Sequence, residues 1–312
     1  MRFLHKIQTK LKNIQNSRGL FLTIDKLFYL LLMRHRTTFI MKEDWDNLII
    51  LDACRYDMFK EISTLEGRLR YIYSKGSSTT HFLDENFKGK NFPDTVYVTA
   101  NPLVNYYSED SFYRVIPVWK DGWHEPYQTV LPETMVEYSL KAIKEYPDKR
   151  LIIHFMQPHF PFIEERTRKM IGEHEGFMSR NIFYGKEAQH TQTVWHLFSM
   201  GKLDRKTVWE AYEANLRIAL EHVKKLLEKL EGKTVITSDH ANLFGEWLLP
   251  FPLKEYGHPG GIYKKSAIKV PWFMIEKRER KEILRGEKRE RDTRIEDEAR
   301  KIKRRLEDLG YL

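Results

Sequence analysis

The chain has little cysteine and no long apolar run. Cys54 is the single cysteine among 312 residues, which excludes an internal disulfide and is typical of a reducing compartment. The longest apolar stretch, residues 20–33, contains Asp25 and Lys26, whereas a membrane-spanning helix needs about 20 predominantly apolar residues. We therefore expect a cytoplasmic protein with no membrane-spanning helix in this stretch. No basic leader or small-residue cleavage site borders it, so we expect the N-terminus to be retained.

Low-complexity composition is absent as well. With 16 Gly, 12 Pro, 41% hydrophobic and 13% aromatic residues, the sequence is neither collagenous nor disordered. Its length suits one large domain or two modest ones. The composition therefore predicts a folded globular protein with a sizeable core.

The net charge of +9 comes from the two ends of the chain. Residues 1–42 carry nine Lys and Arg against one acid, and residues 276–312 carry fourteen against eleven, so the middle is slightly acidic. A protein that binds nucleic acid usually spreads a basic stripe over the folded surface that contacts phosphates. The charge distribution therefore argues against a nucleic-acid partner.

The first 42 residues form a basic segment with helical periodicity. Leu4, Ile7, Leu11 and Ile14 recur at helical spacing with lysines between them. This pattern is typical of a helix that lies on an anionic bilayer surface, and equally of a helix that docks on the protein's own core. We define residues 1–42 as a basic amphipathic N-terminal segment, and we expect that it contacts the inner face of the membrane peripherally if the first alternative holds.

Short apolar runs alternate with helical patterns along the middle of the chain. This alternation predicts an α/β fold with a mostly parallel central sheet flanked by helices. One long helix is predicted at 204–231, with Asp204 as its N-cap and Gly232 beyond its end. The predicted strands are the apolar runs at 47–51, 151–153, 234–237 and 270–275, with a weaker run at 95–99.

These patterns divide the chain into three parts. We predict a catalytic domain over residues 43–275, between the N-terminal segment and a charged helical tail at 276–312. The segments 103–130 and 163–200 have no clean period and are expected to be insertions that determine substrate specificity.

Acidic and imidazole side chains follow three of the predicted strands. Asp52 follows the first run, His154 follows the second, and Asp239 and His240 follow the third. In parallel sheets, ligands bind beyond the carboxyl ends of the strands, so we expect these side chains to share one crevice. Oxygen and nitrogen ligands suit Mn²⁺, Zn²⁺ or Mg²⁺. Taken singly, each could be a helix cap or a buried core group, but together they predict a metal site.

A hydroxyl-rich loop precedes another predicted helix. Residues 74–83 contain Ser77, Ser78 and Thr79 and continue towards Asn86. Such a loop often only supplies the N-cap of the helix, with more hydroxyl groups than the cap requires. Beside a divalent cation, however, a hydroxyl at a helix N-terminus loses its proton more readily, and the helix end offers N–H groups to an anion. The loop is therefore a candidate source of a nucleophile.

The ordered motifs resemble those of a known enzyme superfamily. They are similar to the alkaline phosphatase superfamily, closest to its sulfatase-like branch of sulfatases, phosphonate monoester hydrolases and lipoteichoic-acid-synthase-type phosphotransferases. The resemblance spans about residues 45–275 in the same motif order. The motifs that carry it are Leu51–Asp57, Ser74–Leu83, His154–Phe162, Thr237–His240 with Gly245–Glu246, and Tyr256–Pro259, with Leu309–Tyr311 at the end of the chain.

The resemblance implies an alkaline phosphatase-like fold with one or two divalent metal ions. It makes Asp52, Asp239 and His240 ligands of one metal, joined by the hydroxyl of Thr79. It makes His258 a ligand at a second site or a phosphate contact.

The resemblance also implies catalytic roles. It favours Thr79 as the nucleophile, with Ser78 next and Ser77 as a further alternative. His154 and His159 are expected to face the substrate anion, where they would act as catalytic or substrate-binding groups, or to bind a second metal.

Three departures from the family pattern narrow the reaction. Sulfatases have a second Asp where this chain has Ala53, and their modified Cys lies in a different motif from Cys54. The Asp-x-x-x-His pair of the two-metal phosphatases is not identifiable. Arg55 is a candidate anion-binding group, although an ion pair with Asp57 explains it equally well.

We therefore expect a metal-dependent phosphomonoester or phosphodiester hydrolase, or a phosphotransferase, that acts through a covalent phospho-enzyme. The substrate is expected to be a phosphorylated small molecule, a glycan or a lipid-linked compound. The alternatives are a sulfuric-ester hydrolase and a catalytically degenerate protein that binds a phosphorylated glycan.

Overall fold

The computed structural model describes most of the chain. The described residues are 33–172, 193–248, 253–277 and 279–286, together with Thr23, Ile24, Leu27 and Tyr29. None of the helices among them is both long and apolar enough to span a bilayer. The periodic positions at 4–14 and 295–309 lie outside the described residues.

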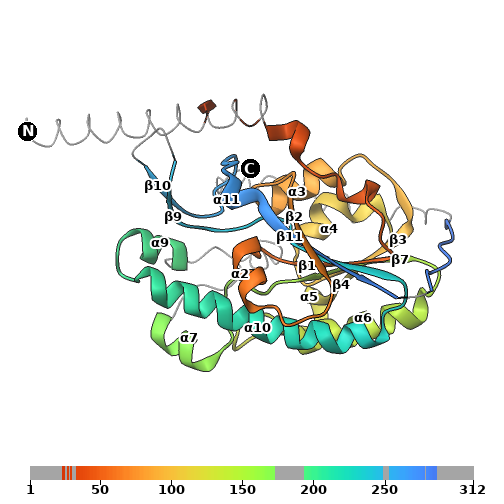
Figure 1. Cartoon of the computed structure of the whole chain (residues 1–312). Helices are drawn as coiled ribbons and strands as arrows, with labels where there is room; N and C mark the ends of the chain where they lie inside the picture. The colour runs from red at the N-terminus through yellow and green to blue at the C-terminus, as the bar shows by residue number, and fades with distance from the viewer. Residues whose placement is uncertain are drawn as a thin grey trace, which may run out of the picture.

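A seven-stranded sheet forms the centre of the protein (Figure 1). Strands β1, β7, β8, β3 and β4 are joined by parallel pairings, and β11 is antiparallel to both β2 and β8. The predicted α/β fold with a mostly parallel sheet is therefore confirmed. In spatial order, the strands are β2 (Arg68–Tyr73), β11 (Lys269–Glu276), β8 (Lys233–Thr237), β1 (Asn47–Leu51), β7 (Arg150–Phe155), β3 (Phe92–Thr99) and β4 (Phe112–Pro117).

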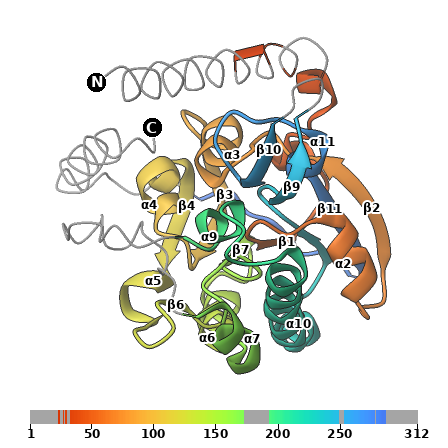
Figure 2. The ribbon, with the colours of Figure 1, turned by 90° about the vertical axis from the view of Figure 1, so that its left-hand side faces the viewer.

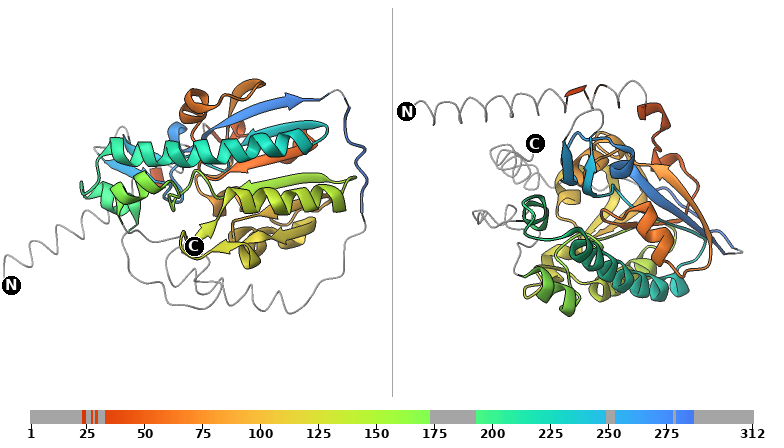
Figure 3. Two further views of the ribbon diagram at one scale, coloured as in Figure 1. Left: turned by 90° about the horizontal axis from the view of Figure 1, so that it is seen from below. Right: turned by 60° about the vertical axis from the view of Figure 1, so that its left-hand side comes forward.

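Helices cover both faces of the sheet (Figure 3). Helices α2, α6 and α10 pack on one face, and α3 and α4 pack on the other. The helices of the described residues are α2 (Tyr56–Ile62), α3 (Thr79–Asn86), α4 (Leu103–Ser108), α5 (Val118–Asp121), α6 (Pro132–Glu145), α7 (Glu165–Ile171), α9 (Val194–Ser199), α10 (Arg205–Lys229) and α11 (Lys265–Ile268), with 3₁₀ turns at Arg34–Arg36, Ile40–Lys42 and Glu109–Ser111.

Helix α10 forms as the sequence predicts. The side chain of Asp204 accepts a hydrogen bond from the backbone N–H of Thr207 and caps the helix. Beyond the last turn, Gly232 adopts a φ of 77°, a conformation that is costly for residues with a side chain. A Cβ at Gly232 would also meet the carboxylate of Asp46, so this position both ends the helix connection and leads directly into β8.

The segment 103–130 differs from its predicted description as an insertion. It contains α4, the edge strand β4, α5 and a small antiparallel pair formed by β5 (Trp123–His124) and β6 (Thr129–Val130). This segment belongs to the central fold, because Val115, Val118 and Trp119 are buried in the hydrophobic cores on the two faces of the sheet. A second small pair, β9 (Leu243–Trp247) and β10 (Lys254–Gly257), follows β8. Of the segment 163–200, residues 173–192 lie outside the described residues.

Alternation along the strands decides which residues reach the α3 side of the sheet. Leu48 and Ile50 of β1 and Ile152 of β7 lie in the core under α3 and α4, whereas Ile49 and Leu51 lie in the core under α10. Because side chains of a strand alternate between its faces, continuing the first set brings the residues just past the strands to the α3 side. Figure 2 looks at this carboxyl edge of the sheet, where β9, β10 and α3 surround the strand ends.

The described parts of the two predicted end segments contact the folded domain. Ile40 and Met41 are buried beside Trp45 in the core under α3. At the other end, the backbone N–H groups of Leu284 and Gly286 donate hydrogen bonds to carbonyls of the domain, and residues 279–286 contain no helix.

An ion-pair cluster ties the C-terminal segment to the start of β1. Arg280 contacts Asp44 at 2.7 Å and the buried Asp46 at 2.6 Å. Hydrogen bonding to Arg280 lowers the pKa of Asp44 to about 2. The pKa of Asp44 is lower in the folded protein than its value near 4 in the unfolded chain. Ionised Asp44 therefore stabilises the folded state above pH 4, and this stabilisation is lost as the pH falls through about 2.

We expect Arg280→Gln to unfold at lower urea concentration than wild type at pH 5, and the difference between the two proteins to shrink towards pH 2. A difference that is constant over this range would contradict the assignment.

Candidate metal centre

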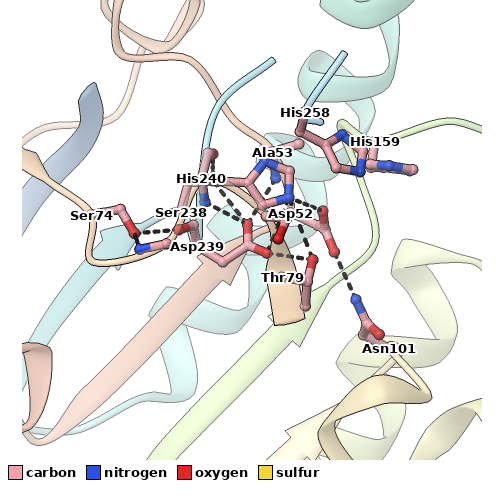
Figure 4. A network of polar contacts seen from close by, with 12 residues as sticks. Asp52, Ala53, Ser74, Thr79, Asn101, His159, Ser238, Asp239, His240 and His258 are labelled. Carbon is pink, nitrogen blue, oxygen red and sulfur yellow. Dashed lines mark hydrogen bonds and ion pairs between the residues drawn. The ribbon is translucent and has the colours of Figure 1, made fainter. Parts of the chain in front are cut away.

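Two carboxylates and an imidazole meet at the carboxyl edge of the sheet, and Figure 4 shows the two carboxylates, Asp52 and Asp239. Asp52 follows β1, His154 is the penultimate residue of β7, and Asp239 lies two residues beyond β8. Each offers one ligand atom, and these atoms lie within 4.8 Å of one another. All three side chains are buried. The structure thus brings together the three strand-end groups that the sequence singled out, although β7 continues past His154 rather than ending before it.

His240 and Thr79 complete this cluster. The Nε2 atom of His240 lies 3.8 Å from Oδ1 of Asp52 and 3.5 Å from Oδ2 of Asp239. Thr79 is the first residue of α3, and its hydroxyl donates a hydrogen bond of 2.8 Å to Asp239 while lying 3.4 Å from Nε2 of His240. The N-terminus of α3 therefore presents a hydroxyl directly to the acidic cluster, as Figure 4 shows.

The cluster fits a divalent cation. Oδ1 of Asp52 is buried without a hydrogen-bond partner, although buried carboxylate oxygens are normally paired. The other oxygen of Asp52 accepts from Asn101, and Asp239 accepts from the backbone N–H groups of Ala53 and His240, so both carboxylates are held in place. Two buried carboxylates with adjacent imidazole and hydroxyl groups form a donor set that suits Zn²⁺, Mn²⁺ or Mg²⁺.

The surroundings keep Asp52 ionised. Burial opposes its negative charge, but His154, His159 and His240 together lower the pKa of Asp52 below its usual range. Burial in turn lowers the pKa of His159. The site therefore combines a charged carboxylate with an imidazole biased towards its neutral form, and a neutral imidazole is the form that binds metals.

A second group of imidazoles lies beside the first. The ring of His258 lies 4.4 Å from that of His240 and 5.0 Å from that of His159, centroid to centroid. Burial, followed by the charge of His240, lowers the pKa of His258 well below its usual value. The structure thus places His159 and His258 next to His240, beside the carboxylates (Figure 4).

Arg55 is occupied by other partners. Its guanidinium forms ion pairs of 2.7 Å with both Asp57 and Glu246, and it donates to the backbone carbonyl of Asn242. Of the two sequence interpretations, the structure shows the ion pair with Asp57. The interaction joins α2 to β9 and supports the loop that follows β8.

The three candidate hydroxyls occupy different positions. Ser78 is the N-cap of α3, and its side chain accepts from the backbone N–H of His81. The hydroxyl of Ser77 accepts a hydrogen bond from the backbone N–H of Gly261. Thr79 is thus the candidate for which a contact with the acidic cluster is found.

Sequence reasoning did not single out several residues that shape the site. Asn101 binds Asp52, Tyr97 contacts Nδ1 of His154 at 3.0 Å, and Asn242 contacts Nδ1 of His258 at 2.7 Å. Asn101 follows β3 closely, so the strand-end criterion that selected Asp52 would have selected it as well. No local pattern marks Tyr97, because it lies within a strand and reads as an apolar core residue.

Solved structures with a similar fold share little sequence with this chain, and no protein-family model or curated protein matches it. Lipooligosaccharide phosphoethanolamine transferase A, an integral membrane protein of Neisseria meningitidis, is 14% identical, with a TM-score of 0.49 over 74% of this chain and 48% of that one. The periplasmic domain of a Campylobacter jejuni phosphoethanolamine transferase is 14% identical, with a TM-score of 0.47 over 74% and 78%. A protein of the alkaline phosphatase superfamily from Vibrio parahaemolyticus is 11% identical, with a TM-score of 0.41 over 77% and 62%.

This chain thus spans about half the length of the Neisseria protein. The Vibrio protein is described as a member of the alkaline phosphatase superfamily, whose motifs the sequence of this chain resembles. At these levels of similarity, the chemistry must be argued from the site itself.

Proposed function

We propose that this protein is a metal-dependent phosphoester hydrolase or phosphotransferase in which Thr79 is the nucleophile. The observation that carries the proposal is the hydrogen bond from the Thr79 hydroxyl to Asp239, made at the N-terminus of α3 inside a buried cluster of acids and imidazoles. A hydroxyl whose proton already points to a carboxylate is arranged for deprotonation.

Asp52, Asp239 and His240 would hold the metal together with the Thr79 hydroxyl. A bound divalent cation supplies Lewis acidity and lowers the pKa of a coordinated hydroxyl. Asp239 accepts the hydrogen bond of Thr79, which orients its Oγ1 for in-line attack on phosphorus. The attack would form the Oγ1–P bond, pass the Thr79 proton to Asp239 and break the bond from phosphorus to the leaving oxygen, which departs as an alcohol once protonated. The product is a phospho-enzyme on Thr79, and water or an alcohol acceptor then takes the phosphoryl group and returns the proton to Thr79.

The imidazoles would act on the substrate. His154 would protonate the leaving oxygen or donate to the phosphoryl oxygens. His159 and His258 lie beside the carboxylates and are biased towards their neutral forms, so they would accept a proton from the attacking water or alcohol or bind a second metal ion. The N–H groups at the start of α3 add a partial positive charge that favours an anionic group there. The substrate class is a phosphorylated small molecule, glycan or lipid-linked compound.

A sulfatase reaction through a modified cysteine is disfavoured by the position of Cys54. Cys54 is fully buried in the core under α10 and does not belong to the hydroxyl loop. Burial raises the pKa of its thiol well above the usual value, so it is held as an inert thiol. The remaining routes use the hydroxyl of Thr79.

The function is tested by hydrolysis of p-nitrophenyl phosphate, bis-p-nitrophenyl phosphate and p-nitrophenyl sulfate. Each ester is assayed with Mn²⁺, Zn²⁺, Mg²⁺ or EDTA. Phosphoester turnover that requires a divalent metal supports the proposal, and the preferred ester separates a monoesterase from a diesterase. Turnover that EDTA leaves unchanged, or turnover of the sulfate alone, would contradict it. Binding of metal and inorganic phosphate without turnover of any ester would favour a degenerate binding protein.

We further propose that the N-terminal segment contacts an anionic membrane on its cytoplasmic face. In addition to its basic charge, the segment exposes Ile24 and Leu27, at 41% and 54% of their surfaces. An exposed apolar residue on a basic segment favours an anionic lipid surface. Such contact would place a lipid-linked substrate near the crevice.

Liposome flotation tests this contact. We expect the double variant Ile24→Ser with Leu27→Ser to bind anionic vesicles several-fold less than wild type, with neither protein binding zwitterionic vesicles strongly. Leu284→Ser is the matched control, because Leu284, in the C-terminal segment, is exposed to a similar degree at 50%. Equal flotation of wild type and double variant would contradict the proposal.

A further inference from the structure

Each of the four histidines in the site makes a hydrogen bond through Nδ1. The partner at Nδ1 decides which ring nitrogen of a neutral imidazole carries the proton, and therefore whether Nε2 is a hydrogen-bond donor or a lone pair. The four partners differ in kind, so the four Nε2 atoms need not be equivalent.

Three of the histidines face acceptors. Nδ1 of His240 lies 3.2 Å from the carbonyl of Ala241, and Nδ1 of His159 lies 2.5 Å from the carbonyl of Phe160. Because a carbonyl only accepts, these Nδ1 atoms carry the proton and Nε2 presents a lone pair.

His258 follows the same rule through a side-chain amide. Its Nδ1 atom lies 2.7 Å from Oδ1 of Asn242, whose NH₂ group donates to the hydroxyl of Tyr212. The amide oxygen therefore faces His258 and accepts its Nδ1 proton. Like the other two, His258 presents a lone pair at Nε2.

His154 faces a hydroxyl donor instead. Its Nδ1 atom lies 3.0 Å from the hydroxyl oxygen of Tyr97, a fully buried residue whose ring contacts those of Phe87 and Phe112. Burial, followed by the charges of the two acids of the site, raises the pKa of Tyr97 well above 10, so the phenol keeps its proton. Within the described part of the chain, His154 is the hydrogen-bond partner found for this hydroxyl. Tyr97 therefore donates to Nδ1, and the proton of neutral His154 resides on Nε2.

The surroundings of Nε2 agree with this arrangement. Nε2 of His154 is buried without a hydrogen-bond partner and lies 3.5 Å from Oδ2 of Asp52. A carboxylate at that distance attracts an N–H group and repels a lone pair. An N–H that faces a carboxylate at 3.5 Å without a hydrogen bond is a donor for an anionic ligand bound in this cluster.

We propose that Tyr97 is a positioning residue that holds His154 as its Nε2–H tautomer, so that His154 donates to the substrate anion and does not bind the metal. His240, with the opposite tautomer, is then the imidazole ligand. The part of this proposal in which His154 donates to a substrate anion rests on the proposed phosphoester function. The assignment of the Nε2–H tautomer to His154 does not.

A purely structural role for the hydroxyl of Tyr97 makes different predictions. Phenylalanine would fill the same space among the neighbouring rings without a buried hydroxyl to satisfy. If the hydroxyl of Tyr97 contacts His154 only to have a hydrogen-bond partner of its own, Tyr97→Phe leaves the tautomer of His154 and the affinity of the site for anions unchanged.

The tautomer is measured directly by NMR of the metal-free protein labelled with ¹⁵N-histidine. Long-range proton–nitrogen correlations distinguish a protonated Nδ1 from a protonated Nε2, and His154→Gln assigns the signal. We expect Nε2–H for His154 in wild type and in Tyr29→Phe, which removes the hydroxyl of another buried tyrosine that donates to a backbone carbonyl. We expect Tyr97→Phe to lose this state. An Nδ1–H signal for His154 in wild type would overturn the proposal, and so would an unchanged signal in Tyr97→Phe.

Calorimetry supplies the second readout with Zn²⁺ and inorganic phosphate. For Tyr97→Phe we expect phosphate affinity of the Zn²⁺-loaded protein to fall about tenfold, as for loss of one hydrogen bond to a charged group, with Zn²⁺ affinity not reduced. His154→Gln keeps an N–H near the position of Nε2 and should retain more phosphate affinity than His154→Ala. A tenfold loss of Zn²⁺ affinity in Tyr97→Phe would make His154 a ligand and overturn the proposal. Failure of wild type to bind Zn²⁺, Mn²⁺ and Mg²⁺ alike would overturn the proposed function, while the tautomer is still decided by NMR.

Discussion

Thr79→Ala is expected to reduce phosphoester turnover by about 10⁴-fold or more, because loss of an enzyme's nucleophile removes the covalent route altogether. The Thr79 hydroxyl makes its hydrogen bonds within the cluster and is not the N-cap, so helix α3 should form in the variant. The measurement is kcat for the best phosphoester of the panel under saturating metal, with circular dichroism as the check on folding.

Two further variants separate a nucleophile from a structural hydroxyl. Thr79→Ser keeps the reacting oxygen and should retain measurable turnover and a trapped phospho-enzyme. Ser78→Ala removes the cap of α3 and should cost about 1 kcal/mol of stability with a much smaller loss of kcat. If Thr79→Ala retained turnover while Ser78→Ala abolished it, the nucleophile would be Ser78.

Asp239→Asn is expected to abolish stabilisation by metal. A ligand that binds only the folded state at 100 times its Kd adds about 2.7 kcal/mol, which corresponds to a rise in Tm of about 4 °C for a protein of this size. Asparagine keeps an oxygen for the N–H groups of Ala53 and His240 but removes the charge that attracts the cation. We therefore expect no rise in Tm with Zn²⁺ or Mn²⁺, together with loss of turnover.

Without metal, Asp239→Asn should not be less stable than wild type. Asp52 and Asp239 are neighbouring buried carboxylates, and removing one charge relieves their repulsion. The Tm of Asp239→Asn without metal should therefore equal or exceed that of wild type. Asp148→Asn, in an ion pair with the buried Lys149 just before β7, is the control that should keep the full metal response. A normal metal response in Asp239→Asn would remove Asp239 from the ligand set.

The strands that position the site were predictable because they are buried on both faces. β1, β7 and β8 read as continuous apolar runs, which is the pattern of a parallel strand between two layers of helices. The edge strands β2 and β4 were not predicted. β2 is mostly exposed and carries Arg68 and Arg70, so its sequence has no apolar run to detect.

The sequence by itself determined the set of strand-end groups. Asp52 and Asp239 follow buried strands and His154 is the penultimate residue of one, and the two-residue repeat of a strand fixes the face on which each one emerges. The start of helix α3 was likewise predictable from the serine and threonine residues that precede it. These features are local, so a short window of sequence contains all the information that they require.

Only the tertiary structure decided what each group touches. Arg55 is paired with Glu246, His258 with Asn242, and His154 with Tyr97, and each pair joins segments more than 15 residues apart. Such contacts depend on which strands are neighbours in the sheet, and that order is set by packing over the whole domain rather than by any local preference. For this reason the sequence predicted where the chemistry lies, whereas the fold assigned the partner, and with it the proton, of each imidazole.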